Sequence, residues 1–538
     1  MEHNWLKVMR LALASLFFAV MTWVFVDFAG KSPEWMRHAI PHIGSYAAIV
    51  VWAVLALLFG RVFCSFICPF GILQDVIGRF APKKWRKHHY SKPYNWLRYS
   101  LLAICAVFLI FGIATPLLVL DPYSNFGRIA VNIFRPLVME GNNGLNWIAL
   151  KFNNYDFYHV TIYTVTTLSF LSAFIVFLLV GAMALLRGRL FCNTICPVGS
   201  LLGLISKVPL FRIVFDESCT KCGLCEKACK AECIDSKAQT VDYSRCVSCF
   251  NCLGKCKKQS IQYKWAYSKN HVIAGLTRNP LSKEGMSGGG LRVKPAMTEV
   301  TPAKATTDKS RRSFLQTSVA MAATVPFIQG CVKAVSKEID TTKLTPITPP
   351  GSVSLPHFKA KCTACHLCIT HCPQQVLKPA GFEFGIDYAF KPHLTFYEMG
   401  FCNYNCTVCA DVCPFHAIVP FQDKDEAGIS KDKQTTQIGI AQFNENLCVV
   451  FTEDTSCGAC SEHCPVQAVR MEPYGDSGLT LPHVYDELCI GCGGCESICP
   501  VRPIKAINIL ANEVHQKAHA PQEEEVKDVD AGSLDFGF

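Results

Sequence analysis

Two cysteine runs decide the fold of the middle of this chain: CTKCGLCEKAC at residues 219–229 and CVSCFNCLGKC at residues 246–256. Each has the spacing Cys-x2-Cys-x2-Cys-x3-Cys, which is typical of [4Fe–4S] cluster ligands. Zinc sites also use Cys-x2-Cys pairs, but they do not need three cysteines in one short stretch followed by a fourth. The spacing therefore predicts two clusters in this segment.

In units of this kind, the fourth cysteine of each run binds the cluster of the other run. We therefore expect one cluster on Cys219, Cys222, Cys225 and Cys256, and the other on Cys246, Cys249, Cys252 and Cys229. The proline that commonly follows the last cysteine is replaced by Lys230 and Lys257. Cys233 is surplus to this set, and we expect it to be a small buried side chain.

Four further runs lie near the C-terminus, and all of them end in Cys-Pro. Their expected ligands are Cys362, Cys365, Cys368, Cys372, Cys402, Cys406, Cys409, Cys413, Cys448, Cys457, Cys460, Cys464, Cys489, Cys492, Cys495 and Cys499. They predict four more clusters, so that the chain holds six [4Fe–4S] clusters. By analogy with four-cluster electron-transfer subunits we expect the first run to pair with the last and the second with the third, although spacing alone does not decide this.

The composition excludes two other classes of protein. Of the 538 residues, 31 are Cys, 50% are hydrophobic and 17% are charged. Disulfide scaffolds are usually short extracellular domains, and they have no reason to repeat one cysteine spacing. The net charge of +10 comes from basic residues that gather in loops beside apolar runs. This distribution indicates membrane topology and argues against a nucleic-acid partner.

Four apolar runs, at residues 8–29, 45–60, 100–120 and 162–186, approach the ~20 residues that a helix needs to cross a bilayer. Their basic flanking loops place both ends of this bundle in the cytoplasm by the positive-inside rule. The sequence therefore predicts an α-helical membrane bundle of four transmembrane helices, in a bacterial inner membrane.

The bundle contains an internal repeat, GRVFCSFICPFGIL at residues 60–73 and GRLFCNTICPVGSL at residues 188–201. Both copies lie on the predicted cytoplasmic side, and they converge if the two halves pack as pseudo-symmetric partners. The cysteines of the two copies are Cys64, Cys68, Cys192 and Cys196. Four such thiols can hold a metal, form a redox-active disulfide or simply pack. Their duplication together with the following proline favours a functional role.

These segments define the predicted domains. They are a membrane domain (1–210), a cytoplasmic two-cluster domain (211–265), a flexible linker (266–309), a twin-arginine export signal that also serves as an anchor if it is not cleaved (310–331), a periplasmic four-cluster domain (332–512) and an acidic tail (513–538). Arg311 and Arg312 carry the export signal, with Gln316 where a basic residue is expected. The alternative is a chance arginine pair before a short amphipathic helix.

The chain lacks a Gly-rich nucleotide loop, a c-type haem motif and a recognisable nucleophile–base set, so it is expected to conduct electrons rather than transform an organic substrate. A membrane bundle makes quinol the natural electron donor. The candidate quinol-site residues are Asp121, Tyr123, Arg128, His38 and His42. The alternative is that they are ordinary loop and helix-cap residues.

The repeat GRVFCSFICP and GRLFCNTICP, followed by the two-cluster segment, resembles the NapH-type membrane subunit of periplasmic nitrate reductase systems and its relative MauN, over about residues 1–265. Residues 311–511 resemble the exported NapG/MauM-type ferredoxin. The resemblance implies α+β ferredoxin-like domains and a quinol dehydrogenase. It would pass electrons from the quinone pool to a periplasmic reductase or a cytochrome c acceptor. In those families the two parts are usually separate chains.

Two other interpretations remain at this point. The chain could be a maturation factor that donates electrons to a periplasmic metalloenzyme through the Cys-x3-Cys-Pro cysteines, or a gene pair joined through an inserted segment near residues 270–300. The quinol hypothesis also has a topological difficulty. One cluster domain is expected in the cytoplasm and the other in the periplasm, so electrons passing between them need a relay.

Overall fold

The computed structural model describes residues 5–28, 30–33, 35–36, 46–82, 88–110, 115–160, 166–265, 345–396, 400–426, 428–475 and 478–520. Residues 1–266 and 345–538 form one compact unit, and a second unit covers residues 267–344. The predicted linker beyond residue 265, the export signal, His38 and His42 lie outside the described residues.

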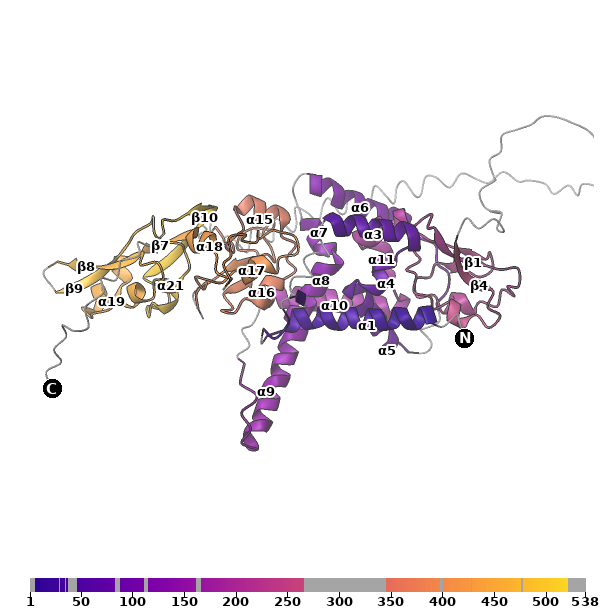
Figure 1. The fold of residues 1–538 in the computed structure, drawn as a ribbon, viewed down its shortest axis with the longest axis horizontal. Coiled ribbons are helices and arrows are strands. Elements are labelled where there is room, and N and C mark those ends of the chain that lie inside the picture. Colours follow the sequence, from indigo (N-terminus) through magenta and orange to yellow (C-terminus); the bar gives the residue numbers. More distant parts are fainter. Residues whose placement is uncertain are drawn as a thin grey trace, which may run out of the picture. The chain divides into compact units, whose positions relative to one another are not determined.

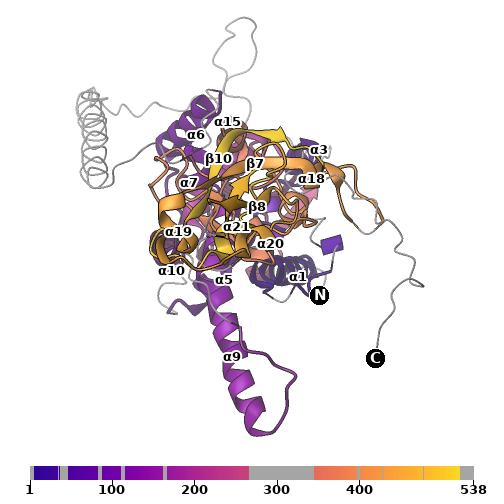
Figure 2. The same cartoon turned by 90° about the vertical axis from the view of Figure 1, so that its left-hand side faces the viewer.

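The N-terminal part of the first unit is built from helices (Figure 1). They are α1 (Trp5–Val26), α3 (Tyr46–Phe59), α4 (Phe63–Phe66), α5 (Pro69–Phe80), α6 (Asn95–Ile110), α7 (Thr115–Leu120), α8 (Pro122–Ile129), α9 (Arg135–Lys151), α10 (Thr167–Arg187), α11 (Leu190–Thr194) and α12 (Pro197–Ile205), with a π-helical turn η2 (Ala130–Phe134) before α9. Helix α9 projects away from the others in both views (Figures 1 and 2).

Two of these helices, α1 and α10, are long and apolar enough to cross a membrane. Helices α3 and α6 are apolar but shorter. The expected third span covers α6, which ends at Ile110, and α7, which begins at Thr115, and the residues between these two helices lie outside the described part of the chain. The prediction of four membrane-spanning helices is therefore not confirmed.

The two copies of the repeat pack against each other with reciprocal contacts. Arg61 donates from Nη2 to the carbonyl oxygen of Cys192 at 2.9 Å, and Arg189 donates from Nη1 to the carbonyl oxygen of Cys64. Gly71 follows the first copy's Cys-Pro, and a Cβ there would lie 2.5 Å from the Cys64 carbonyl oxygen. The two halves thus pack as pseudo-symmetric partners.

The first cluster segment is enclosed by a pair of antiparallel strands. Strand β1 (Phe211–Phe215) pairs with β4 (Ile261–Trp265), and the short hairpin of β2 (Ile234–Asp235) and β3 (Thr240–Val241) separates the two cysteine runs. The short helix α13 (Leu224–Lys227) and the 3-10 turn η3 (Leu253–Lys255) connect these parts.

The C-terminal part repeats this plan. Strand β7 (Thr436–Phe443) pairs with β10 (Ile507–Lys517) around the hairpin of β8 (Val469–Tyr474) and β9 (Leu479–Val484), and a smaller hairpin joins β5 (Leu377–Pro379) to β6 (Pro392–Leu394). The helical elements are α15 (Leu355–Lys361), α16 (Leu367–His371), α17 (Val408–Asp411), α18 (Lys431–Thr435), η5 (Glu445–Leu447), α19 (Val449–Glu453), α20 (Ala459–Glu462) and α21 (Gly494–Ile498). Strand β10 continues into the range predicted as an acidic tail.

The substitution Gly71→Ala should destabilise the bundle by about 1–3 kcal/mol, because its methyl group would overlap the Cys64 carbonyl. Gly141→Ala in α9 is the control, since a Cβ at Gly141 meets nothing within 4 Å. Thermal unfolding of the detergent-solubilised chain measures both. Equal melting temperatures for Gly71→Ala and the wild type would contradict the close approach of Gly71 to the Cys64 carbonyl oxygen.

Candidate functional site

 Four cysteines of the first cluster segment line a cavity of 190 Å³. Its cysteine lining is Cys219, Cys222, Cys225 and Cys256. Three of these come from the first run and the fourth from the second run, which is the exchange that the spacing predicts.

The other four predicted ligands of this segment also lie together, three from the second run and one from the first. The thiol of Cys252 is surrounded by those of Cys249, Cys246 and Cys229. Cys233 is buried as expected, and its sulfur lies 3.5 Å from the sulfur of Cys229. The surplus cysteine thus packs directly against a predicted cluster ligand.

The C-terminal cysteines pair differently from the prediction. One cavity is lined by Cys362, Cys365, Cys368 and Cys413, and another by Cys448, Cys457, Cys460 and Cys499. The thiol of Cys409 lies near those of Cys402, Cys406 and Cys372, and the thiol of Cys495 near those of Cys492, Cys489 and Cys464. The first run therefore pairs with the second and the third with the fourth, so the expected pairing was wrong. The physical reason is that β7 and β10 enclose the last two runs alone.

These cysteine sets fit clusters better than single metal ions. Among the residues that the structure describes, no three His, Cys, Asp or Glu side chains are grouped closely enough to hold one metal ion. In a mononuclear zinc site every thiolate lies about 2.3 Å from the metal, so the thiolates crowd together. A [4Fe–4S] core holds its thiolates further apart, at the corners of a cube.

The candidate quinol-site residues Asp121, Tyr123 and Arg128 lie on α8 and at its start, against the first C-terminal cluster site. A Cβ at Gly127 would lie 2.2 Å from the carbonyl oxygen of Cys365, so α8 touches the ligand loop directly. The ring of Tyr123 packs edge-on against Phe415, with 6.2 Å between centroids. The structure thus brings these three candidates together beside the cysteines of a predicted cluster site.

Asp121 and Tyr123 have distinct environments. Asp121 caps α8, and its Oδ2 accepts from the backbone N–H of Ser124 at 2.7 Å. Burial raises the pKa of the Asp121 carboxyl, although the Ser124 hydrogen bonds and the Arg128 charge oppose this. The Tyr123 hydroxyl is buried and has no hydrogen-bond partner among the described residues. The helix-cap interpretation therefore holds for Asp121, while Tyr123 keeps an unsatisfied polar group.

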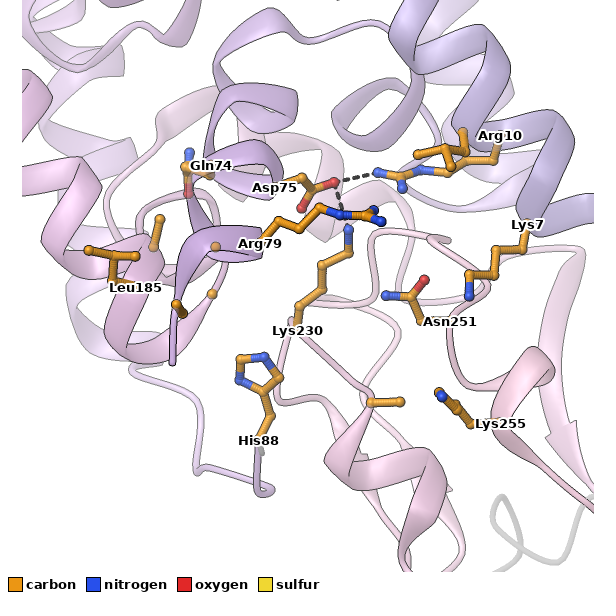
Figure 3. Close-up of a pocket in the computed structure, with 16 residues that line it drawn as sticks. Lys7, Arg10, Gln74, Asp75, Arg79, His88, Leu185, Lys230, Asn251 and Lys255 are labelled. Carbon is orange, nitrogen blue, oxygen red and sulfur yellow. Dashed lines mark hydrogen bonds and ion pairs between the residues drawn. The ribbon is translucent and has the colours of Figure 1, made fainter. Parts of the chain in front are cut away.

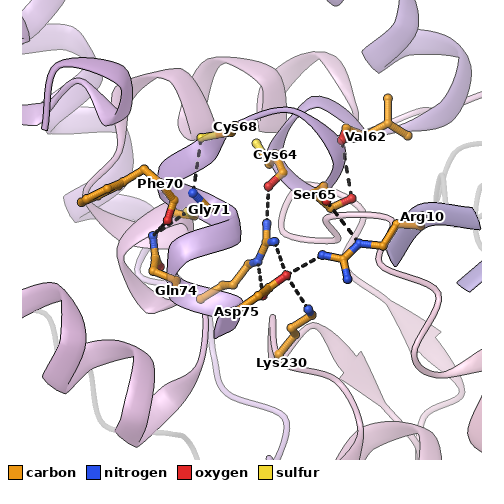
Figure 4. A network of polar contacts seen from close by, with 12 residues as sticks. Arg10, Val62, Cys64, Ser65, Cys68, Phe70, Gly71, Gln74, Asp75 and Lys230 are labelled. Atoms are coloured by element: carbon orange, nitrogen blue, oxygen red, sulfur yellow. Dashed lines mark hydrogen bonds and ion pairs between the residues drawn. The ribbon is translucent and has the colours of Figure 1, made fainter. Parts of the chain in front are cut away.

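Near the N-terminal end of α1, the carboxylate of Asp75 joins several elements. Asp75 on α5 accepts from Arg189 at 2.6 Å. It also pairs with Lys230 at 2.6 Å and binds Arg10 on α1 (Figures 3 and 4). Burial alone would raise the pKa of Asp75, but the charges of Arg189, Lys230 and Arg10 outweigh it and hold this pKa well below its usual range. Lys230, which replaces the usual proline, thereby attaches the first cluster domain to the helices.

Sequence reasoning missed the role of the buried arginines. Arg61 donates to Asn193 Oδ1 at 2.8 Å, and Arg98 donates to the Ser244 carbonyl oxygen at 3.0 Å. Both side chains are fully buried. Their positions in basic loops suggested only membrane topology. Both repeats begin with a Gly-Arg pair in the same register, and this was the signal that could have identified Arg61 and Arg189.

The four repeat cysteines are buried at this end of the helices. Cys68 and Cys196 cap α5 and α12, accepting from Gly71 N at 3.4 Å and Gly199 N at 3.3 Å. Gln74 donates to the sulfur of Cys192 at 3.2 Å. Burial raises the pKa of Cys68, Cys192 and Cys196, so as free thiols they would stay protonated at neutral pH. Their visible contribution is to helix capping and packing.

Two family models match parts of the chain. One, described as a 4Fe-4S binding domain, matches residues 41–88 and 169–215, which contain the two copies of the repeat. The other, described as a 4Fe-4S dicluster domain, matches residues 455–502, which contain most cysteines of the last two runs. The dicluster match agrees with the pairing of the third run with the fourth.

Three relatives indicate the kind of protein. An uncharacterized protein of Methanocaldococcus jannaschii is 28% identical over 41% of this chain and 80% of its own length. The methylamine utilization ferredoxin-type protein MauM of Methylorubrum extorquens is 27% identical over 34% and 81%. The ferredoxin-type protein NapG of Escherichia coli is 26% identical over 34% and 78%. The chain is a ferredoxin-type iron–sulfur protein related to MauM and NapG. No solved structure matches it.

The cluster pairing can be tested with double substitutions. If Cys362 and Cys413 bind the same cluster, Cys362→Ser with Cys413→Ser should lose no more iron than either substitution alone. Cys362→Ser with Cys499→Ser should lose two clusters, because those ligands belong to different sites. Iron content per chain and the electron paramagnetic resonance of the reduced protein measure both. The reverse result would restore the first-with-last pairing.

The substitution Asp75→Asn should destabilise the folded chain by about 3–5 kcal/mol, since it leaves buried cations without their counter-charge. Because the folded-state pKa of Asp75 is lowered, its stabilisation is present above about pH 4 and is lost as the pH falls below that value. Thermal unfolding from pH 7 to pH 3 measures this, with the exposed Asp156→Asn as control. A difference between wild type and Asp75→Asn that does not shrink in acid would contradict the assignment.

Proposed function

We propose that this chain is a membrane-bound electron-transfer protein that oxidises quinol and passes the electrons to a periplasmic reductase. The clusters would accept electrons one at a time and supply the redox chemistry when bound. The residues of this chain hold the clusters, position the quinol and shield the site from water.

The contact between α8 and the first C-terminal cluster site carries this proposal. Gly127 allows α8 to lie against the Cys365 carbonyl, and Tyr123 and Asp121 occupy the same short helix. A quinol bound there would lie beside a cluster. The buried Tyr123 hydroxyl has no hydrogen-bond partner in the part of the chain that the structure describes, and it would bind a quinol oxygen.

The contacts of α1 support the proposed topology. Near its N-terminus, Arg10 binds Asp75 beside the first cluster domain, and near its C-terminus, Phe25 accepts at its carbonyl oxygen from Thr370 Oγ1 at 3.3 Å. Helix α1 has 22 residues, which is about 30 Å and close to the hydrocarbon thickness of a bilayer. The first cluster domain, through Lys230 on the same carboxylate, and the C-terminal cluster region, through Thr370, thus meet α1 near opposite ends, as a cytoplasmic and a periplasmic domain would.

This arrangement also bears on the topological difficulty. If quinol is oxidised at α8, the C-terminal clusters can receive electrons directly, on the periplasmic side. Electron delivery to the acceptor then needs no transfer across the bundle from the first cluster domain. The resemblance of residues 311–511 to exported NapG/MauM-type ferredoxins favours a periplasmic acceptor, and the matches to the ferredoxin-type proteins MauM and NapG support that resemblance.

Reduction of the clusters by a quinol analogue in isolated membranes tests the proposal. We expect Tyr123→Phe and Asp121→Asn each to slow reduction about tenfold or more, since each removes a group beside the reacting quinol. Asparagine can still cap α8, so Asp121→Asn should fold.

Tyr155→Phe and Asp156→Asn are matched controls, because both residues are exposed. Chemical reduction by dithionite should be unchanged in all four variants. If quinol leaves the wild-type clusters oxidised while dithionite reduces them, the proposal is overturned.

A further inference from the structure

A cavity of 340 Å³ lies between α1, α5, α10 and the first cluster domain, and neither the clusters nor the proposed quinol site uses it (Figure 3). Its volume is within the range of small-molecule sites. The cationic side chains that line it are Lys7, Arg10, Arg79, Lys230 and Lys255. Asp75 is the only acidic residue among those lining it in the described structure.

The charges at the floor of this cavity are unbalanced. Arg10, Arg189 and Lys230 all bind the single carboxylate of Asp75, and their side chains are mostly buried. Cys249, a predicted cluster ligand, lies close enough to Lys230 to affect its charge, so a bound cluster would compensate part of this positive charge. Buried positive charge without full compensation is costly and favours binding of an anion.

The rim of the cavity adds further positive charge. Lys7, Arg79 and Lys255 make no ion pair with any described residue. Figure 3 shows Lys7 and Lys255 on the side of the cavity away from Gln74. His88 also lines the cavity, but burial lowers its pKa, so it adds little charge at neutral pH. Cations on several elements thus surround one space.

One wall of the cavity is apolar. Leu11 on α1 and Leu185 on α10 line it, and these are the two helices that are long and apolar enough to cross a membrane. The polar part of the cavity lies at the N-terminal end of α1 and the C-terminal end of α10, where a lipid headgroup would lie. Basic pockets between membrane helices on the cytoplasmic side are suited to anionic lipid headgroups.

We propose that this cavity binds a phosphate-bearing anion, with the headgroup of an anionic phospholipid as its source. Lys7, Arg79 and Lys255 would bind the phosphate oxygens, while Leu11 and Leu185 would contact the start of an acyl chain. Such a ligand would link the first cluster domain to the membrane surface. The lipid source rests on the membrane location proposed above, whereas binding of free phosphate does not.

The test uses the full-length chain purified in detergent. Native mass spectrometry compares binding of phosphatidylglycerol with binding of phosphatidylcholine, and thermal unfolding with and without sodium phosphate measures the free anion. The variant is Lys7→Gln with Arg79→Gln, which removes two rim charges without breaking an ion pair between described residues. The control is Lys207→Gln with Lys264→Gln, which removes two exposed charges outside the cavity.

We expect the wild type and the control to prefer phosphatidylglycerol, and the cavity variant to bind it about tenfold more weakly or worse. Stabilisation by sodium phosphate that the cavity variant loses, without any preference for phosphatidylglycerol, would identify free phosphate as the source. If the cavity variant and the control behave alike with both probes, the proposal is overturned. None of these outcomes depends on whether quinol reduces the clusters.

Discussion

The carboxylate of Asp75 is the interaction on which the arrangement of the first cluster domain depends. It is the shared counter-ion for cations from α1, from the second repeat and from the cluster domain itself. Each of these cations would be unfavourable in its buried position without it. Because one carboxylate serves three elements, the position of the cluster domain is coupled to the packing of the two repeats.

The two repeats are held together by reciprocal hydrogen bonds, in which an arginine side chain of each copy donates to a backbone carbonyl of the other. Arg61 of the first copy binds the Cys192 carbonyl of the second, and Arg189 of the second binds the Cys64 carbonyl of the first. The same arginines reach further, since Arg61 also binds the Ser244 carbonyl of the cluster domain at 3.2 Å, and Arg189 binds Asp75. The two pseudo-symmetric repeats therefore together hold the first cluster domain, which does not share their pseudo-symmetry.

The sequence predicted the ligands of the first cluster segment and their exchange, because cluster geometry dictates cysteine spacing locally. It did not predict the pairing of the C-terminal runs, since that depends on which strands enclose which runs, a long-range feature. The buried arginines escaped for a different reason. A basic loop that faces lipid headgroups and one that binds a domain have the same composition, and only packing separates Arg98 from an exposed residue such as Lys207.

The candidate quinol-site residues show what the sequence predicts about this segment and what only the structure reveals. The segment containing Asp121, Tyr123 and Arg128 was singled out for its ionisable groups beside an apolar run, but Asp121 proves to be the cap of α8. The cap and a functional role are compatible, because capping fixes the start of α8 and so fixes Tyr123 and Gly127 relative to the cluster loop. A glycine is required where α8 meets the Cys365 carbonyl. Close approach, rather than any single ionisable group, is therefore the feature that places this helix against the loop of predicted cluster ligands.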